Sequence, residues 1–169
     1  MINDTLPDPS QEEATTQRVL FVCLGNICRS PAAEGMFLHL LAREELEPRF
    51  RVDSAGTGGW HVGKPADPRM REAAARRGIH LPSRARRLVP SDLRRFDHIL
   101  TMDADNLAEV RALADRHGAT ARIAPLVHHC RRSTAAEVPD PYYGGPEGFE
   151  TVLDLLEDAC AGLLEDLRS

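Results

Sequence analysis

Two reactive side chains, Cys23 and Arg29, stand six residues apart near the start of the chain, and Ser30 follows directly. A cysteine thiolate is a strong nucleophile, and the planar guanidinium of an arginine binds a tetrahedral oxyanion through parallel hydrogen bonds. A hydroxyl group such as that of Ser30 can donate a hydrogen bond to the thiolate. The three residue types at this spacing therefore predict nucleophilic chemistry on a phosphate group, with Cys23 as the nucleophile.

The surrounding segment predicts a strand, a tight loop and the start of a helix. Arg18 to Leu24 is an apolar, β-branched-rich run typical of a buried strand, and Gly25-Asn26 are the residue types that best tolerate a positive φ. Ser30 is a preferred N-cap residue, and Pro31 suits the first helical position. Backbone N–H groups and the helix dipole then point into one concavity, which favours phosphate and a thiolate. An ordinary core cysteine is the alternative, but it leaves the Arg-Ser pair unexplained.

Strand and helix patterns alternate along the rest of the chain. The expected elements are a helix over Pro31 to about Glu47, a strand over Phe50–Ala55, a helix opening at Asp67-Pro68 and closed by Gly78, a helical turn over Ser91–Arg95, strands over His98–Met102 and Arg122–Val127, and helices over Ala104–His117 and Glu147–Leu167. This alternation is typical of a doubly wound parallel sheet, whose ligands bind at the carboxyl edge of the strands. Cys23, Gly56, Asp103 and the loop after Val127 each follow a strand, so we expect the functional residues to meet at that edge.

Length and composition predict one globular domain. The chain has 169 residues, of which 42% are hydrophobic and 28% charged, and its formal net charge of -5 argues against a nucleic-acid binder. No apolar run approaches the ~18 residues of a membrane span, and the polar N-terminus does not resemble a signal peptide, so we expect a cytoplasmic protein. Residues 1–17 predict a disordered tail before a folded domain over residues 18–169. Four unevenly spaced cysteines predict no disulfide scaffold.

The loop C-L-G-N-I-C-R-S-P-A-A-E, which begins at Cys23, resembles the phosphate-binding loop of the low-molecular-weight protein tyrosine phosphatases. The resemblance extends over roughly residues 18–168 and includes four further segments: Asp53-Ser-Ala-Gly-Thr57, Trp60-His-Val-Gly63, Phe96 to Asn106, and Asp140-Pro-Tyr-Tyr-Gly-Gly145. It implies an α/β, flavodoxin-like three-layer sandwich, with a four-stranded parallel sheet of order 2-1-3-4 and helices on both faces.

The resemblance also implies a mechanism. Cys23 would attack phosphorus to form a phosphocysteine intermediate, while Arg29 and the N–H groups of Leu24 to Ser30 would hold the phosphate oxygens. Asp140 would protonate the leaving oxygen and then activate the hydrolytic water. Spacing alone supports Asp140 weakly, because an Asp-Pro pair most often begins a turn.

Further residues receive roles from the same resemblance. Asn26 would hold the loop in its strained shape, Ser30 would donate a hydrogen bond to the thiolate, and Trp60 would form a substrate wall. The expected substrate-binding set is Leu24, Gly25, Asn26, Ile27, Cys28, Ser30, Trp60, Tyr142 and Tyr143. Asp103 is either part of a polar network that supports the loop or an N-cap for the following helix. Cys28 is either a structural thiol or the partner of Cys23 in a reversible, protective disulfide.

Neither a cofactor nor a metal is expected. His128-His129-Cys130 is the one run that suggests metal ligands, but its spacing lacks the C-x-x-C pattern of a zinc site. The expected partners are a phosphotyrosine-containing protein and, as product or inhibitors, inorganic phosphate and other oxyanions. We expect a monomer that binds neither nucleic acid nor membrane.

Three alternatives share the predicted fold. An arsenate reductase would need two resolving cysteines on a mobile segment, whereas residues 61–129 contain no cysteine and only Cys130 could serve singly. In arginine phosphatases related to this family, a threonine replaces the residue at the position of Ile27, and the tandem tyrosines here favour a flat aryl group. A non-catalytic phosphoprotein-binding module would be expected to lack Cys23, Arg29 or Asp140.

Overall fold

The computed structural model describes residues 16–168, so the predicted disordered tail over residues 1–17 lies almost entirely outside the described residues. Four parallel strands form one sheet in the order β2-β1-β3-β4. The elements are β1 Gln17–Cys23, α2 Arg29–Arg43, η1 Glu47–Arg49, β2 Phe50–Gly56, α3 Pro68–Ala75, α4 Asp92–Arg95, β3 His98–Thr101, α5 Ala104–His117, β4 Arg122–Pro125, η2 Leu126–His129 and α6 Pro146–Arg168. The predicted α/β class and strand order are confirmed.

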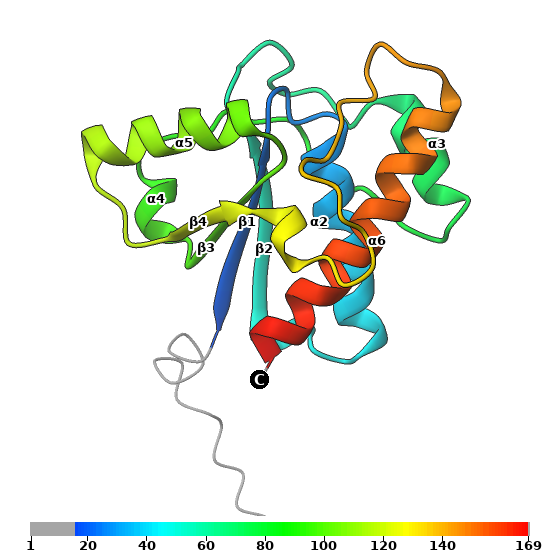
Figure 1. Ribbon diagram of the computed structural model, residues 1–169, viewed down its shortest axis with the longest axis horizontal. Coiled ribbons are helices and arrows are strands. Elements are labelled where there is room, and N and C mark those ends of the chain that lie inside the picture. The colour runs from blue at the N-terminus through cyan, green and yellow to red at the C-terminus, as the bar shows by residue number, and fades with distance from the viewer. Residues whose placement is uncertain (1–15, 169) are drawn as a thin grey trace, which may run out of the picture.

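The side chains of β1 alternate between two hydrophobic cores. Val19, Phe21 and Cys23 face a large core shared with α2 and α6, whereas Leu20 and Val22 face a smaller core beneath α4 and α5. Successive strand residues point to opposite faces, so an apolar run of this kind is covered on both. Figure 1 shows α4 and α5 on one side of the strands and α2, α3 and α6 on the other, which confirms the expected layers.

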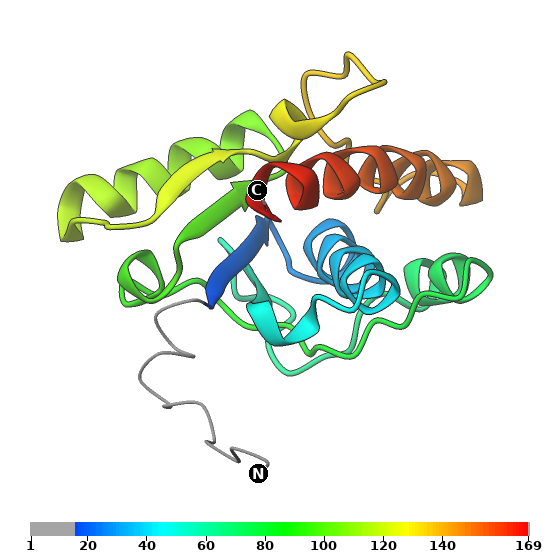
Figure 2. The same cartoon turned by 90° about the horizontal axis from the view of Figure 1, so that it is seen from below.

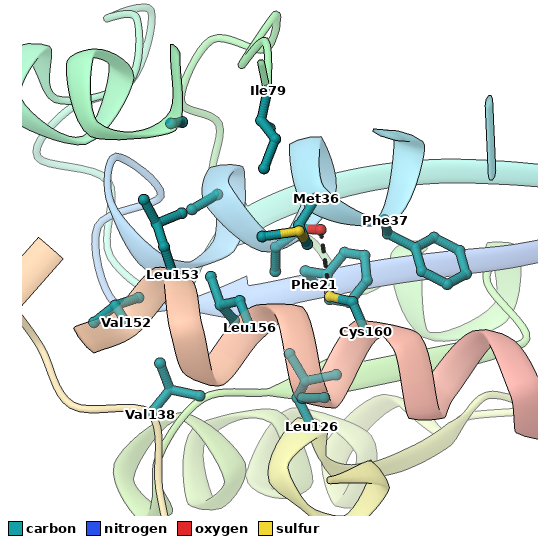
Figure 3. Close-up of a cluster of buried hydrophobic side chains, with 14 of the residues drawn as sticks. Phe21, Met36, Phe37, Ile79, Leu126, Val138, Val152, Leu153, Leu156 and Cys160 are labelled. Atoms are coloured by element: carbon teal, nitrogen blue, oxygen red, sulfur yellow. Dashed lines mark hydrogen bonds between the residues drawn. The ribbon is translucent and has the colours of Figure 1, made fainter. Parts of the chain in front are cut away.

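The large core fixes the helix that follows the cysteine loop. Helix α6 lies along α2 (Figure 2). In Figure 3, Leu156 and Cys160 of α6 point toward Phe21 of β1, and the Cys160 thiol contacts the Ala33 carbonyl oxygen at 3.7 Å. Phe21 and Phe37 meet edge to face with ring centroids 5.8 Å apart. Burying a side chain of this size stabilises a fold by about 1.5–3 kcal/mol, so this packing holds α2 against the sheet.

Both ends of α2 differ from the prediction. The helix begins at Arg29 with Cys28 at the N-cap, and Ser30 is not the cap because its hydroxyl points toward Cys23. The helix ends at Arg43, earlier than the expected Glu47. Glu45 adopts a φ of 56°, and the N–H groups of Glu45 and Leu46 donate to carbonyl oxygens of the last turn. This is a Schellman motif with glutamate at the position where glycine is usual, so the sequence contains no glycine that would predict the end of the helix.

The other elements agree more closely with the prediction. Asp67 caps α3 by accepting a hydrogen bond from the Arg69 N–H group, and Gly78, with a φ of 76°, closes the turn after it. Helix α5 has the predicted bounds. Strand β4 ends at Pro125, two residues earlier than expected, because the chain turns there into the short helix η2.

Helix α6 is the longest element, with 23 residues. Charged residues interrupt its sequence throughout, and no helix within residues 16–168 combines the length and apolar character needed to cross a membrane.

Candidate active site

The loop after β1 lies at the point where the sheet changes winding direction. The chain leaves β1 toward α2 on one face, and it leaves the neighbouring β3 toward α5 on the other. In doubly wound sheets a crevice forms at the carboxyl edge between two such strands. Cys23 is the last residue of β1 and therefore lies at this edge of the sheet.

The loop surrounds the Cys23 sulfur with hydrogen-bond donors. The sulfur lies 2.9 Å from the Ser30 hydroxyl oxygen and accepts a hydrogen bond from the Asn26 N–H group at 3.3 Å. The backbone N–H groups of Gly25, Ile27 and Cys28 have no hydrogen-bond partner within the described chain. The first N–H groups of α2 also lack intrahelical acceptors. A ring of free donors at a helix N-terminus is suited to bind an anion beside the sulfur.

Asn26 locks this loop through its side chain. Its φ is 55°, and its amide nitrogen donates to the hydroxyl oxygens of Ser30 at 2.7 Å and Ser54 at 2.9 Å. Its amide oxygen accepts from the Arg86 N–H group at 3.0 Å. Because Ser30 accepts from Asn26, its hydroxyl proton can be donated to the Cys23 sulfur at 2.9 Å, with the Ala55 carbonyl oxygen as a more distant acceptor at 3.5 Å. The side chains of Asn26 and Ser30 are buried behind the loop and support it, while the pocket wall is formed by other residues of the substrate-binding set.

Arg29 is buried beside the loop with its guanidinium held by three groups. Its Nη1 atom lies 2.6 Å from Asp103 Oδ2 and donates to the Val138 carbonyl oxygen at 3.1 Å, and its Nη2 atom lies 3.7 Å from Asp140 Oδ2. Burial alone would lower the pKa of Arg29, but Cys23 and Asp103 outweigh it and raise the pKa. Asp103 also accepts from the Asn106 N–H group at the start of α5, so both roles considered for Asp103 are present at once.

A pocket of about 410 Å³ opens above the loop. Cys23, Arg29 and Asp140 all line it, although they lie far apart in the sequence. The other wall residues from the predicted set are Leu24, Gly25, Ile27, Cys28, Trp60, Tyr142 and Tyr143, and His61 joins them. The pocket therefore combines a buried thiol and a buried guanidinium with an exposed carboxyl group and several aromatic rings.

The segment that carries Asp140 is tied down on both sides. Before it, the Val138 N–H group donates to the Met102 carbonyl oxygen at the end of β3. After it, the Tyr142 N–H group donates to Asp140 Oδ1 at 3.0 Å. The Tyr142 carbonyl oxygen accepts from Arg69 Nη2, also at 3.0 Å. Asp140 thus has one oxygen engaged by the backbone and the other directed toward the guanidinium of Arg29.

Arg69 was not predicted as a site residue. Its guanidinium pairs with Asp67 through two contacts of 3.1 and 2.9 Å and lies over the ring of Tyr142 with 5.4 Å to the centroid. Asp67 in turn donates its backbone N–H to the Ile27 carbonyl oxygen. Burial would raise the pKa of Asp67, but hydrogen bonds from Arg69 outweigh it and lower the pKa. Arg69 therefore connects the cysteine loop with the Asp140 segment. The only sequence signal near this contact was Asp67, which was predicted to begin the helix.

A buried polar group beneath the loop was missed as well. The Ser54 hydroxyl donates to Glu34 Oε1 at 2.6 Å, and Glu34 is only 4% exposed. Burial raises the pKa of Glu34, and Asp53 adds to the effect. Arg86 binds Asp53 at 3.0 Å and Asp92 through both of its terminal nitrogens. A glutamate on the apolar face of the first helix was the available signal for this network.

The other three cysteines do not gather at one place. Cys28 lines the pocket, and burial, assisted by Asp67 and Cys23, raises its pKa to about 12. Cys160 is fully buried in the large core, and Cys130 lies near Asp158, so neither of them lines the pocket. Within the described chain, no three His, Cys, Asp or Glu side chains form a group that could hold a metal ion.

Comparisons with known proteins point in the same direction as this geometry. The family model for low molecular weight phosphotyrosine protein phosphatase matches residues 18–169. The low molecular weight protein-tyrosine-phosphatase YfkJ of Bacillus subtilis is 44% identical over 151 residues, covering 89% of this chain and 95% of the relative. The crystal structure of a protein tyrosine phosphatase from Entamoeba histolytica superposes with a TM-score of 0.85 at 43% identity, covering 90% and 97% of the two chains. The crystal structure of a Drosophila arginine phosphatase superposes with a TM-score of 0.84 at 32% identity, covering 89% of this chain and 98% of the other.

Proposed function

Because the chain belongs to the low molecular weight phosphotyrosine protein phosphatase family, we propose that it hydrolyses phosphotyrosine in proteins through a phosphocysteine intermediate on Cys23. One observation carries the proposal: a single pocket brings together the Cys23 thiol, the Arg29 guanidinium and the Asp140 carboxyl group beneath aromatic rings. These are a nucleophile, a binding group for the phosphate oxygens and a proton donor, which are the three requirements of the reaction.

In the first step, the Cys23 sulfur attacks phosphorus and the bond to the tyrosyl oxygen breaks. Negative charge develops on the equatorial oxygens, where Arg29 and the free N–H groups of Gly25, Ile27 and Cys28 bind it. Asp140 donates its proton to the leaving tyrosyl oxygen, so that a neutral phenol departs. Because these donors are already in place, they need not reorganise as the charge develops.

In the second step, a water molecule attacks the phosphorus of phosphocysteine. Asp140, now a carboxylate, accepts a proton from this water, and the bond between sulfur and phosphorus breaks. Inorganic phosphate leaves and the Cys23 thiolate is regenerated, stabilised by the Ser30 hydroxyl and the Asn26 N–H group. The proposed cycle uses protein groups alone, so we expect it to need no metal.

The rim of the pocket favours an aryl leaving group. Tyr142 and Tyr143 meet edge to face with ring centroids 4.9 Å apart, and Trp60 belongs to the same wall. Ile27 presents an apolar side chain where it could contact the leaving group. An arginine phosphatase is the second candidate, because one such enzyme shares the fold at 32% identity. We favour phosphotyrosine because flat rings line this pocket.

The test compares initial rates of phosphate release from a phosphotyrosine peptide and a phosphoarginine peptide, both in EDTA. Wild-type protein should hydrolyse the phosphotyrosine peptide faster, and Cys23→Ser should abolish the activity. Phosphate should still raise the Tm of Cys23→Ser, because the loop donors remain. A preference for phosphoarginine would overturn the substrate assignment. Undiminished turnover by Cys23→Ser would overturn the mechanism.

A further inference from the structure

A second cavity of about 740 Å³ adjoins the catalytic pocket and takes no part in the chemistry described above. Leu24 and Trp60 contribute to the walls of both, and both are unusually exposed for apolar residues, at 44% and 69%. We call this second space the side cavity. Because it shares a wall with the catalytic pocket, a peptide whose phosphotyrosine fills the pocket can lay a neighbouring residue in it.

The wall between the two spaces is preformed. The N–H groups of Thr57 and Gly58 donate to the carbonyl oxygens of Cys23 and Leu24, each at 2.9 Å, so this loop is fixed to the end of β1. The Trp60 ring lies so close to the Gly58 backbone that a side chain at Gly58 would overlap it. The indole therefore forms a ridge in a defined position, and little ordering is needed when a peptide binds across it.

The far wall of the side cavity carries two carboxylates. Asp105 and Glu109 lie four residues apart on α5, on the same face of the helix, and both are exposed. Neither forms an ion pair or a side-chain hydrogen bond with another residue in the range 16–168. Like charges at this spacing repel each other and weaken the helix slightly, so a bound cation would relieve the repulsion.

One cation, Arg87, also lines the side cavity. Residues 86–88 pair with the end of β2, through hydrogen bonds between Gly56 and both Arg86 and Leu88, and this pairing places Arg87 beside Gly59. The Arg87 side chain has no ion pair with any residue that the structure describes. With two carboxylates and one guanidinium in its lining, the side cavity has a net negative charge.

We propose that the side cavity is a substrate subsite, in which Asp105 and Glu109 bind a lysine or arginine side chain next to the phosphotyrosine. The inference rests on the proposed phosphotyrosine phosphatase function and adds a sequence preference to it. Exposed ion pairs are individually weak, so the preference should be modest and should fall with added salt.

The experiment measures kcat/KM for three phosphotyrosine peptides that differ only in one residue beside the phosphotyrosine, which is Lys, Ala or Glu. The substitution is placed before the phosphotyrosine in one series and after it in another. In one of the series, wild-type protein should prefer Lys over Ala by about two- to fivefold at low salt. The double variant Asp105→Asn/Glu109→Gln should bring that ratio close to one. Asp115→Asn, which removes a carboxylate farther along α5, is the matched control and should leave the ratio unchanged.

The proposal is overturned if wild-type protein shows no Lys preference in either series, or if Asp115→Asn reduces the preference as much as the double variant does. A preference for Glu that Arg87→Gln abolishes would also overturn it, because the cavity would then select acidic residues through Arg87. Free phosphotyrosine serves as a separate substrate. Its hydrolysis by wild-type protein supports the proposed function independently, so a failure of the subsite is distinguishable from a failure of the catalytic assignment.

Discussion

Replacing Arg69 with lysine should impair the proton donor without touching the nucleophile. Arg69 holds the Tyr142 carbonyl oxygen at 3.0 Å, and the Tyr142 N–H group donates to Asp140 Oδ1. Lysine keeps the charge near Asp67, but it has no planar fork with which to bind Asp67 and Tyr142 together. The Asp140 segment of Arg69→Lys should therefore populate positions in which the carboxyl group is poorly aligned with the leaving oxygen.

The size of the effect follows from the contacts that lysine cannot make. One hydrogen bond to the Tyr142 carbonyl shifts an equilibrium by about two- to tenfold, and contact of the guanidinium with the ring adds a smaller factor. Arg69 is 48% exposed, which weakens both. We expect kcat to fall about five- to twentyfold on an aryl phosphate with a poor leaving group. On an activated aryl phosphate, whose leaving group needs no proton, the loss should stay below about threefold.

The assay compares kcat for both kinds of leaving group in wild type, Arg69→Lys, Asp140→Ala and the double variant. Arg76→Lys is the control, because Arg76 lies near the end of α3 with exposed ion pairs to Glu72 and Glu150. If Arg69 acts through Asp140, its replacement should have almost no effect once Asp140 is alanine. Equal losses on both leaving groups, or an undiminished loss in the Asp140→Ala background, would refute the reasoning.

Three shorter predictions concern the acid, the buried glutamate and the second loop cysteine. Asp140→Ala should lower kcat about 10²- to 10⁴-fold on poor leaving groups and much less on activated ones, and equal losses would remove Asp140 from the acid role. Burial raises the pKa of Glu34 in the folded state, so ionisation of Glu34 destabilises the fold. The Tm of Glu34→Gln relative to that of wild type should therefore rise as the pH is raised from acidic to neutral. A Tm difference that stays constant with pH would contradict this. With a pKa of about 12, Cys28 is a neutral thiol at pH 7, so peroxide should oxidise Cys23 first, to a sulfenic acid. Because Cys28 lines the same pocket, its thiol should then condense with this sulfenic acid to form a disulfide and release water. After prolonged exposure to peroxide, dithiothreitol should restore the activity of wild-type protein but not that of Cys28→Ser. Equal recovery of the two proteins would contradict the disulfide.

The sequence predicted the parts of the site that depend on neighbouring residues. The strand before Cys23, the turn at Gly25-Asn26 and the helix after it all follow from local propensity. The error at Ser30 has a physical reason. A capping serine would occupy the N–H groups at the start of α2, whereas here Cys28 stands at the N-cap without a side-chain hydrogen bond. A helix that begins in this way keeps its N–H groups free for an anion.

The supports of the site depend on contacts between distant parts of the chain, and a single sequence does not reveal them. Arg69 meets Tyr142 across 73 residues, and the Arg86 side chain meets Asp53 across 33. Each of these arginines looks like a solvated surface residue in a chain that contains many. The packing of α3 against α6 brings Arg69 to the Tyr142 carbonyl, and the pairing of residues 86–88 with the end of β2 brings Arg86 to Asp53.

Asn26 is the position at which local and distant requirements coincide. The tight loop needs a residue that tolerates a φ of 55°, which glycine or asparagine can provide. The network beneath the loop needs two donors, for Ser30 and Ser54, and one acceptor, for the Arg86 N–H group. Glycine meets the first requirement alone, and aspartate lacks the donors. The asparagine amide meets both requirements: it donates to Ser30, whose own proton can then point at the Cys23 sulfur. A residue that does not line the pocket thereby supports the hydrogen bonding of the nucleophile.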